Sequence, residues 1–258
     1  MPEPSLRIAS LVPSLTELLF ALDLGDNLVA RTGFCIHPRE QVRRVPKVGG
    51  TKDVDVDALL ATRPTHLVVN VDENRKDAIE ALRARVPTIV VTHPLAPEDN
   101  VALYEEFGRL FDRRCEAARL AAELSSARDE LERAVRNARQ HSVLYLIWKG
   151  PWMTVSRSTY ISSMLAMANL VTLPANSVSR YPELATDDAA WLAAGVVLLS
   201  SEPYAFRQKH ADELSRRSPT PSPLLLVDGE MLSWYGSRAI AGVHYLKHLR
   251  AEIDLLLS

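Results

Sequence analysis

Aromatic side chains are placed in this chain where they could bind a ligand rather than fill a core. Trp148, Trp152 and Trp234 lie in segments between predicted strands and helices, and Tyr204 and Tyr235 lie in similar segments. Indole and phenol rings offer large, rigid contact surfaces to flat or macrocyclic molecules at little cost in conformational entropy. These residues predict a surface that binds a flat ligand. Burial in the core is the alternative for each tryptophan.

The segment Ser233–Arg238 places two of these aromatic rings beside a guanidinium group. Its sequence is Ser-Trp-Tyr-Gly-Ser-Arg. Arg238 can clamp a carboxylate or stack on an aromatic ring. We therefore predict that Arg238 also contacts the ligand.

Two histidines raise the possibility of metal chemistry. His37 and His93 each precede a proline and each follow a predicted strand. Imidazole suits transition metals, and Cys35, Glu73 or Asp228 could complete a site. Direct metal binding, axial ligation of a chelated metal and a metal-dependent enzyme are therefore alternative hypotheses for these two residues. Loop histidines that bond to the backbone are the simpler interpretation.

Polar side chains follow another buried strand. Asn70, Glu73 and Asn74 come directly after it and can hydrogen-bond to the amide or carboxylate edges of a ligand. Alternatively, Asn74 caps the helix that follows. Ser233, His244 and Asp228 supply the residue types of a hydrolase, but no G-x-S-x-G motif accompanies them. The prediction is a protein that is not an enzyme.

Composition excludes several functional classes. The 258 residues are 47 % hydrophobic and have a formal net charge of −2, so the chain has no general attraction to nucleic acid or anionic membranes. Its 16 prolines outnumber its 10 glycines, and no Gly-rich phosphate loop or H-E-x-x-H motif occurs. The two cysteines are too few for a disulfide framework.

The N-terminal residues carry no basic region followed by an apolar stretch of the kind found in signal peptides. The prediction is a cytoplasmic protein as written, or a periplasmic one if a leader has been trimmed. No apolar run approaches the roughly 20 residues of a membrane span, so membrane insertion is not expected. We expect a monomer that needs no cofactor.

Short apolar runs alternate with helical patterns, which predicts an α/β protein with parallel sheets. Ser14 and Glu17 are the expected capping box of a helix that runs through Phe20, and further helices are expected over Asp53–Ala61 and Arg75–Arg85. The predicted strands are Arg7–Val12, Leu28–Arg31, His66–Asn70, Thr88–Val91, Ser142–Ile147, Val196–Ser200 and Leu224–Val227.

The middle of the chain has helix formers but no strand signal. We expect one helix, a kink near Asp112 and a long helix over Arg113–Gln140, which would span roughly 40 Å. Such a helix between two strand-rich regions predicts two Rossmann-like lobes joined by a rigid connection, with lobes at residues 1–112 and 141–258. A helical hairpin packed on one larger domain is the alternative.

Ligands of parallel α/β sheets bind at the carboxyl ends of the strands. The residues just after each predicted strand are therefore the candidates, and they combine aromatic, polar and imidazole groups. The predicted ligand-binding residues are Ser14, Phe34, His37, Asn70, Glu73, Asn74, His93, Trp148, Trp152, Tyr204, Asp228, Trp234, Tyr235 and Arg238.

The N-terminal segment Arg7-Ile-Ala-Ser-Leu-Val-Pro-Ser-Leu-Thr-Glu-Leu18 resembles the start of the iron-chelate and cobalamin substrate-binding proteins of ABC importers. The resemblance continues through Val48-Gly-Gly50 and Asp57-Ala-Leu-Leu-Ala-Thr-Arg-Pro64, and covers nearly the whole chain. It implies two α/β lobes joined by one rigid helix. It also implies a metal chelate as ligand, namely a cobalamin-like corrinoid, a ferric siderophore or haem, and a role in transport.

The resemblance also implies a protein partner. In cobalamin-binding members, an acidic residue on each lobe pairs with arginines of the membrane permease, and these residues match Asp57 and Asp188. Both are aspartate where those members carry glutamate. Stabilisation of a helix N-terminus is the alternative role for both carboxylates. A cytosolic ligand sensor or chaperone is the alternative function.

Overall fold

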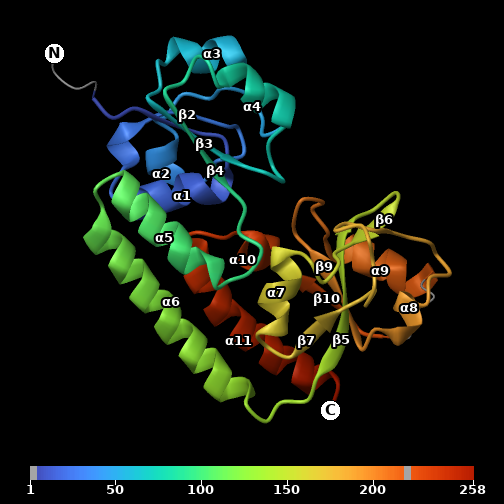
Figure 1. Cartoon of the computed structure of the whole chain (residues 1–258). Helices are drawn as coiled ribbons and strands as arrows, with labels where there is room; N and C mark the ends of the chain where they lie inside the picture. The colour runs from blue at the N-terminus through green and yellow to red at the C-terminus, as the bar shows by residue number, and fades with distance from the viewer. Residues whose placement is uncertain (1–4, 218–221) are drawn as a thin grey trace. The chain divides into compact units, whose positions relative to one another are not determined.

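Two α/β units make up the chain, as the computed structural model shows for residues 5–217 and 222–258 (Figure 1). This confirms the predicted α/β class with two Rossmann-like lobes. The predicted boundaries at residues 112 and 140 stay predictions. Unit 1 comprises the residues up to Pro94, Asn100–Ala121 and Tyr235–Arg238. Unit 2 comprises Leu95–Asp99, Ala122–Trp234 and Ala239–Ser258.

Unit 1 is built on a parallel sheet with the strand order β2-β1-β3-β4. Each strand overlaps its predicted range, because short runs of Val, Ile and Leu are typical of strands buried on both faces. The ladder between β3 and β4 ends with Asn70 opposite Thr92. The strands are β1 (Ile8–Ser10), β2 (Leu28–Arg31), β3 (His66–Asn70) and β4 (Thr88–Thr92).

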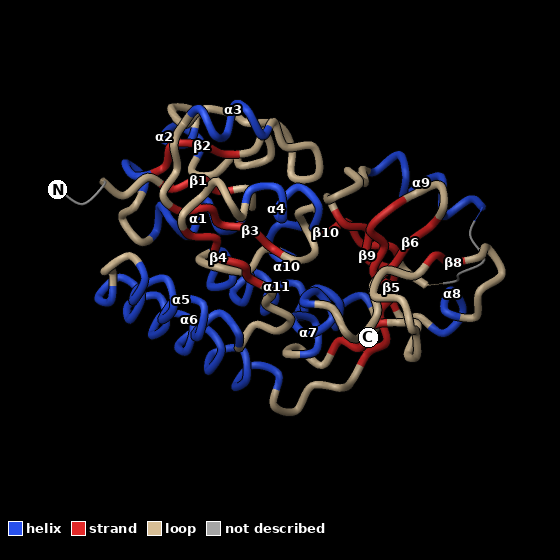
Figure 2. The backbone as a smooth tube through the Cα atoms, turned by 45° about the horizontal axis from the view of Figure 1, so that its top comes forward, coloured by secondary structure: helices blue, strands red, loops and turns tan. Residues whose placement is uncertain are grey.

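Helices cover this sheet and complete its core (Figure 2). Leu59 and Leu82, from two of these helices, pack with Leu67 and Val69 of β3. The helical elements of this part of the chain are α1 (Pro13–Ala21), η1 (Gly25–Asn27), α2 (Arg39–Val42), α3 (Val56–Ala61), α4 (Lys76–Leu82) and α5 (Asp99–Leu110).

The predicted capping box of α1 is wrong. The helix begins at Pro13, and its N-cap residue Val12 makes no side-chain capping bond. Proline suits the first helical position because its fixed φ is already helical and its missing N–H has no partner there. Ser14 therefore lies inside the first turn, and Glu17 forms an ion pair with Arg238 instead.

Unit 2 contains a mixed sheet with the order β10-β9-β5-β6-β8, and β7 also pairs with β5. The parallel strands β5, β7, β9 and β10 form one part of the sheet, and β6 and β8 are antiparallel. The strands are β5 (His141–Trp148), β6 (Trp152–Thr154), β7 (Leu170–Thr172), β8 (Glu183–Leu184), β9 (Val196–Ser200) and β10 (Leu224–Val227).

The expectation of a wholly parallel second sheet is therefore corrected. After β5 the chain turns at Gly150, whose φ is +78°, and Trp152 returns antiparallel to β5. Strands of two or three residues are too short to produce a periodic apolar pattern, so the sequence contains no signal for β6 or β8.

The long helix α6 (Arg114–Val135) is shorter than predicted. It ends before Gln140 because the Asn169 amide donates hydrogen bonds to the carbonyls of Val135 and Ala138, each at 3.3 Å. The predicted break before it is confirmed, since Asp112 has a positive φ of 54° between α5 and α6. The division into units falls within α6, between Ala121 and Ala122.

The remaining helices follow the strands of unit 2 and form the C-terminus. In the described part of the chain, no helix combines the length and apolar character that crossing a membrane requires. These helices are α7 (Tyr160–Ala166), α8 (Ala190–Ala193), α9 (Gln208–Arg217), α10 (Gly229–Ser233) and α11 (Arg238–Leu256).

Candidate functional site

Aromatic rings gather in unit 2 where β5 and β9 end. The Trp148 and Tyr204 rings meet edge to face with centroids 5.5 Å apart, and the Tyr204 and Phe206 centroids are 4.7 Å apart. Phe206 in turn stacks on Trp152 at 6.2 Å. We call these four residues, together with His210, the aromatic cluster. It joins three predicted ligand-binding residues, Trp148, Trp152 and Tyr204.

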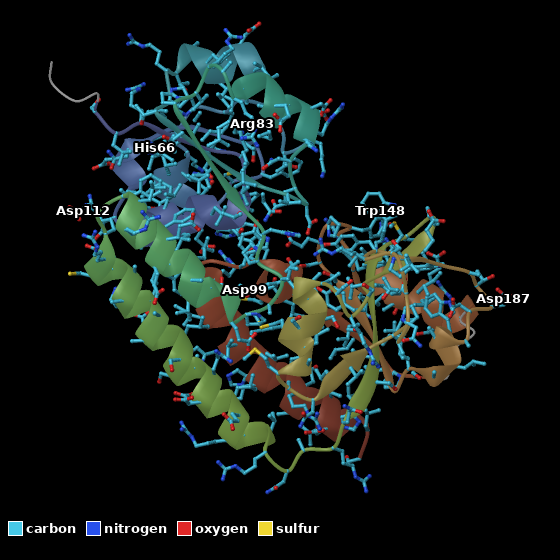
Figure 3. The ribbon with its side chains drawn as sticks, viewed as in Figure 1. His66, Arg83, Asp99, Asp112, Trp148 and Asp187 are labelled. Carbon is cyan, nitrogen blue, oxygen red and sulfur yellow. The ribbon has the colours of Figure 1, made fainter. Side chains whose placement is uncertain are left out.

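Burial within the aromatic cluster increases from one edge to the other. Trp148 is 40 % exposed and Tyr204 is partly exposed, whereas Phe206 is buried and Trp152 contacts the fully buried Trp191. Figure 3 marks Trp148 at the end of β5. The ring faces available to a ligand are therefore those of Trp148 and Tyr204, and Phe206 and His210 hold Tyr204 in place.

His210 fixes the orientation of the Tyr204 hydroxyl. Its Nδ1 atom accepts a hydrogen bond from the Arg207 backbone N–H at 3.0 Å, and its Nε2 atom lies 3.3 Å from the Tyr204 hydroxyl. Burial lowers the pKa of His210, which favours the neutral ring. In that ring the proton is on Nε2 and is donated to the Tyr204 oxygen. The tyrosine proton can then be donated to another molecule.

Lys149 lies beside the cluster, but its charge is balanced. Its ammonium group forms an ion pair with Glu213 and sits 5.9 Å from the centroid of the Trp152 ring. This pair fixes the side of the cluster next to the turn at Gly150.

Two further predicted ligand-binding residues make hydrogen bonds within the loops of unit 2. Trp234 is buried, and its Nε1 atom donates to Glu202 Oε1 at 2.7 Å. Ser233 Oγ donates to the same oxygen at 2.7 Å, and burial raises the pKa of Glu202. Asp228 is the N-cap residue of α10, where its Oδ1 atom accepts from the Glu230 N–H at 3.0 Å.

In unit 1, the amides of Asn70 and Asn74 build the loop after β3. Asn74 Oδ1 accepts from the Asn70 N–H at 2.9 Å, and Asn74 Nδ2 donates to the carbonyls of Leu11 and Thr51. Asn70 Oδ1 accepts from the Asp72 N–H at 2.8 Å. The alternative role of Asn74 as a helix cap is wrong, because Arg75 occupies that position at α4 without a side-chain bond.

Apolar side chains are exposed at this end of unit 1. Phe34 is 62 % exposed after β2, Val71 is 54 % exposed after β3, and Ile36 is also exposed. Phe34 was predicted from the sequence to bind a ligand, and Val71 was not. Exposed apolar side chains that gather at one end of a sheet can mark a contact site for a ligand or partner.

The two histidines predicted as metal ligands follow β2 and β4 of unit 1. His93 Nε2 lies 3.4 Å from Asp72 Oδ2, and His37 is half-buried in the loop after β2. Residues 5–217 and 222–258 contain no group of three or more His, Cys, Asp or Glu side chains arranged to hold a metal ion. Metal ligation by His37 and His93 stays a prediction.

Four residues from late in the chain, Tyr235–Arg238, belong to unit 1, and we call them the strap. The Tyr235 hydroxyl donates to Glu73 Oε1 at 2.7 Å, and Arg238 makes two bonds of 2.8 Å to Glu17. The strap backbone is bonded at Gly236, which donates to Asn100 Oδ1 at 2.6 Å. Tyr235 and Arg238 thus anchor the strap within unit 1.

Ser14 and the two predicted docking residues lie at helix starts. Ser14 is buried in the first turn of α1. Asp57 is exposed in the first turn of α3, next to the cap that Asp55 makes with the Ala58 N–H. Asp188 Oδ1 accepts from the Ala190 N–H at 2.8 Å, at the start of α8. The docking role of both aspartates stays a prediction.

Most of the chain matches the model of a known protein family. A family model described as "Periplasmic binding protein" matches residues 8–220. Among curated proteins, a vitamin B12-binding protein of Photorhabdus laumondii is 23 % identical over 195 residues, which cover 76 % of this chain and 70 % of the relative. One from Yersinia pestis is 38 % identical over 58 residues, which cover 22 % of this chain and 20 % of that relative.

Solved structures share the fold. The periplasmic heme-binding protein RhuT of Roseiflexus sp. RS-1 superposes with a TM-score of 0.83 at 19 % identity, covering 99 % of this chain and 100 % of that one. The vitamin B12-binding protein BtuF of Vibrio cholerae has a TM-score of 0.80 at 16 % identity, with 96 % and 97 % covered. These structures are similar to both units of the chain.

Proposed function

Because the chain belongs to the periplasmic binding protein family, we propose that it is a non-enzymatic binding protein for a metal chelate. The chelate is a cobalamin-like corrinoid, haem or a ferric siderophore. The observation that carries this proposal is the aromatic cluster, which presents Trp148 and Tyr204 at the carboxyl ends of β5 and β9. Similar proteins named for vitamin B12 and heme binding support the choice of ligand.

The aromatic cluster binds the chelate by burying apolar surface, not by a covalent or coordination bond. A planar macrocycle that covers the Trp148 face removes apolar surface from water, and each fully covered aromatic side chain contributes about 1.5–3 kcal/mol. Tyr204 is held by Phe206 and His210 and itself packs against Trp148, so little side-chain entropy is lost on binding. Binding is therefore favourable without closure of a flexible loop.

Unit 1 contributes an apolar contact surface of its own. Phe34, Ile36 and Val71 are exposed at the carboxyl ends of β2 and β3. We propose that these side chains form a surface of unit 1 that contacts a chelate. Asn70 and Asn74 support the loop that carries Val71, and we assign them no direct contact.

The proposal includes a role in transport. A binding protein of this family would deliver its chelate to an ABC permease, and Asp57 and Asp188 are the proposed docking residues. A protein with this role in transport would work in the periplasm.

Spectral titration with cyanocobalamin, haemin and ferrichrome tests the function, with quenching of tryptophan fluorescence as a second readout. We expect one of these chelates to bind, and Trp148→Ala to raise its Kd roughly tenfold or more. Tyr181→Ala is the matched control, because Tyr181 is similarly exposed in unit 2 but lies outside the cluster. Absence of binding to all three chelates would overturn the proposal, and bound free metal in elemental analysis would favour the histidine alternative.

A further inference from the structure

Glu73 is fixed at both its backbone and its side chain. Its N–H donates to Asn70 Oδ1 at 3.3 Å, and its Oε1 atom accepts from the Tyr235 hydroxyl at 2.7 Å. Tyr235 itself is only 6 % exposed and is part of the strap. A carboxylate held in this way keeps one position, so its charge acts in a defined place.

The bond between Tyr235 and Glu73 keeps its proton on the tyrosine. Burial and the neighbouring Glu73 carboxylate raise the pKa of Tyr235 well above its usual value. The phenol therefore remains a neutral donor over the physiological pH range. The phenol thus donates this bond to a carboxylate oxygen of Glu73.

Glu73 lies in the same loop as an exposed apolar side chain. Glu73 is partly exposed and is two residues from Val71, which is 54 % exposed. Charged groups nearby along the chain or bonded to this loop include Asp72, which pairs with His93, and Arg75, which pairs with Asp77. Lys52 donates to the Asp72 carbonyl at 2.6 Å. A fixed negative charge at an apolar contact surface attracts hydrogen-bond donors and repels other carboxylates.

The corresponding loops of unit 2 also carry acidic residues. Glu202 follows β9, and Asp228 and Glu230 follow β10. The nearby cation of Lys149 is balanced by Glu213. At the strand ends of unit 1, the Glu73 carboxylate therefore favours a ligand that donates hydrogen bonds and carries no carboxylates at its edge.

We propose that Glu73, positioned by Tyr235, makes the strand ends of unit 1 select chelates whose edges donate hydrogen bonds, such as an amide-bearing corrinoid, over chelates with carboxylates, such as haem. This inference rests on the proposed function and narrows its ligand class. Tyr235 is a positioning residue, because it acts through Glu73. Glu73 is the specificity-determining residue.

The test compares the Kd values of cyanocobalamin, which carries amides, and haemin, which carries two propionates. We expect the wild-type protein to bind cyanocobalamin more tightly than haemin. A hydrogen bond to a charged group is worth enough for Glu73→Gln to reduce this preference roughly tenfold, and Glu73→Lys should reduce it further. Tyr235→Phe should reduce it in the same direction and have no added effect in the Glu73→Gln background.

Glu80→Gln is the matched control. Glu80 is an exposed carboxylate on α4, where it pairs with Arg83, and its loss should leave the preference unchanged. A wild-type preference for haemin, or a preference unaffected by Glu73→Gln and Glu73→Lys, overturns the inference while chelate binding still supports the proposed function. Failure of the wild-type protein to bind any chelate overturns the proposed function itself.

Discussion

Arg238 and Glu17 form a two-point ion pair across 221 positions of the sequence. Nε and Nη2 of the arginine each lie 2.8 Å from a carboxylate oxygen, and both side chains are largely buried. The planar guanidinium matches the carboxylate in a way that an ammonium group does not. The pair therefore joins the strap to α1 within unit 1.

Removing this pair should destabilise unit 1. We expect Arg238→Ala to lower the free energy of unfolding by about 3 kcal/mol, because it leaves a largely buried carboxylate without its partner. Arg238→Lys should recover only part of this loss. Urea denaturation followed by circular dichroism measures both, and equal stability of Arg238→Ala and wild type would contradict the prediction.

Gly236 should tolerate no side chain. Its φ is +77°, and an added Cβ would lie 3.2 Å from Leu18 Cβ and 3.3 Å from the Ser14 carbonyl oxygen. Gly150 has almost the same φ, +78°, with no atom within 4 Å of its added Cβ. We expect Gly236→Ala to cost about 2–4 kcal/mol and Gly150→Ala about 1–2 kcal/mol.

The two glycine variants separate backbone strain from crowding. Their difference in the free energy of unfolding reports the cost of packing against α1 alone. If both variants lose the same stability, the strap does not pack tightly at Gly236.

The sequence predicted the elements whose signals are local. The runs His66–Asn70 and Val196–Ser200 are β3 and β9 as predicted, because apolar and β-branched residues between turn signals are typical of buried strands. The rule that ligands bind at the carboxyl ends of strands then singled out Trp148 and Tyr204, which the structure brings together.

The missed features depend on contacts between distant residues. Phe206 and His210 were not predicted as members of the site, because their contacts with Tyr204 depend on how the loop beyond β9 folds. The close spacing of Tyr204 and Phe206 in the sequence was a usable signal. The partner of Glu17 could not be read from any local pattern, because it lies 221 residues away. A capping box was the nearest local explanation for that glutamate, and it was wrong.

Glu202 should limit stability at neutral pH. Burial raises the pKa of its carboxyl, so the folded protein holds this proton more tightly than the unfolded chain does. The free energy of unfolding therefore decreases as the pH rises from the ordinary value near 4.3 through the raised folded value. Glu202→Gln keeps an oxygen that accepts from Ser233 and Trp234 and removes the buried charge.

We expect Glu202→Gln to be more stable than the wild type at pH 7 and to lose this advantage near pH 4. Glu202→Ala should instead lose about 1–3 kcal/mol at both values, because the Trp234 Nε1–H is left without its acceptor. Urea denaturation at the two pH values measures the difference. Greater stability of the wild type than of Glu202→Gln at pH 7 would show that the charge itself is favourable.

His210 should make chelate binding depend on pH. Burial lowers the pKa of its imidazole, so the neutral ring that accepts from the Arg207 N–H is fully present above the ordinary value near 6.5 and is lost as the pH falls through the lower folded value. Protonation puts a proton on Nδ1 and removes that bond. Tyr204 then loses its fixed neighbour, and the contact surface of the aromatic cluster loosens.

We expect the Kd of the bound chelate to rise as the pH is lowered from 7.5 to 5 in the wild-type protein, and to change little in His210→Phe. At pH 7.5 the variant should bind roughly threefold to tenfold more weakly, because Tyr204 must be immobilised on binding. His244→Phe is the control, since His244 is an exposed residue of α11 outside the aromatic cluster. The same fall in affinity in His210→Phe as in the wild type would assign the pH dependence to another group.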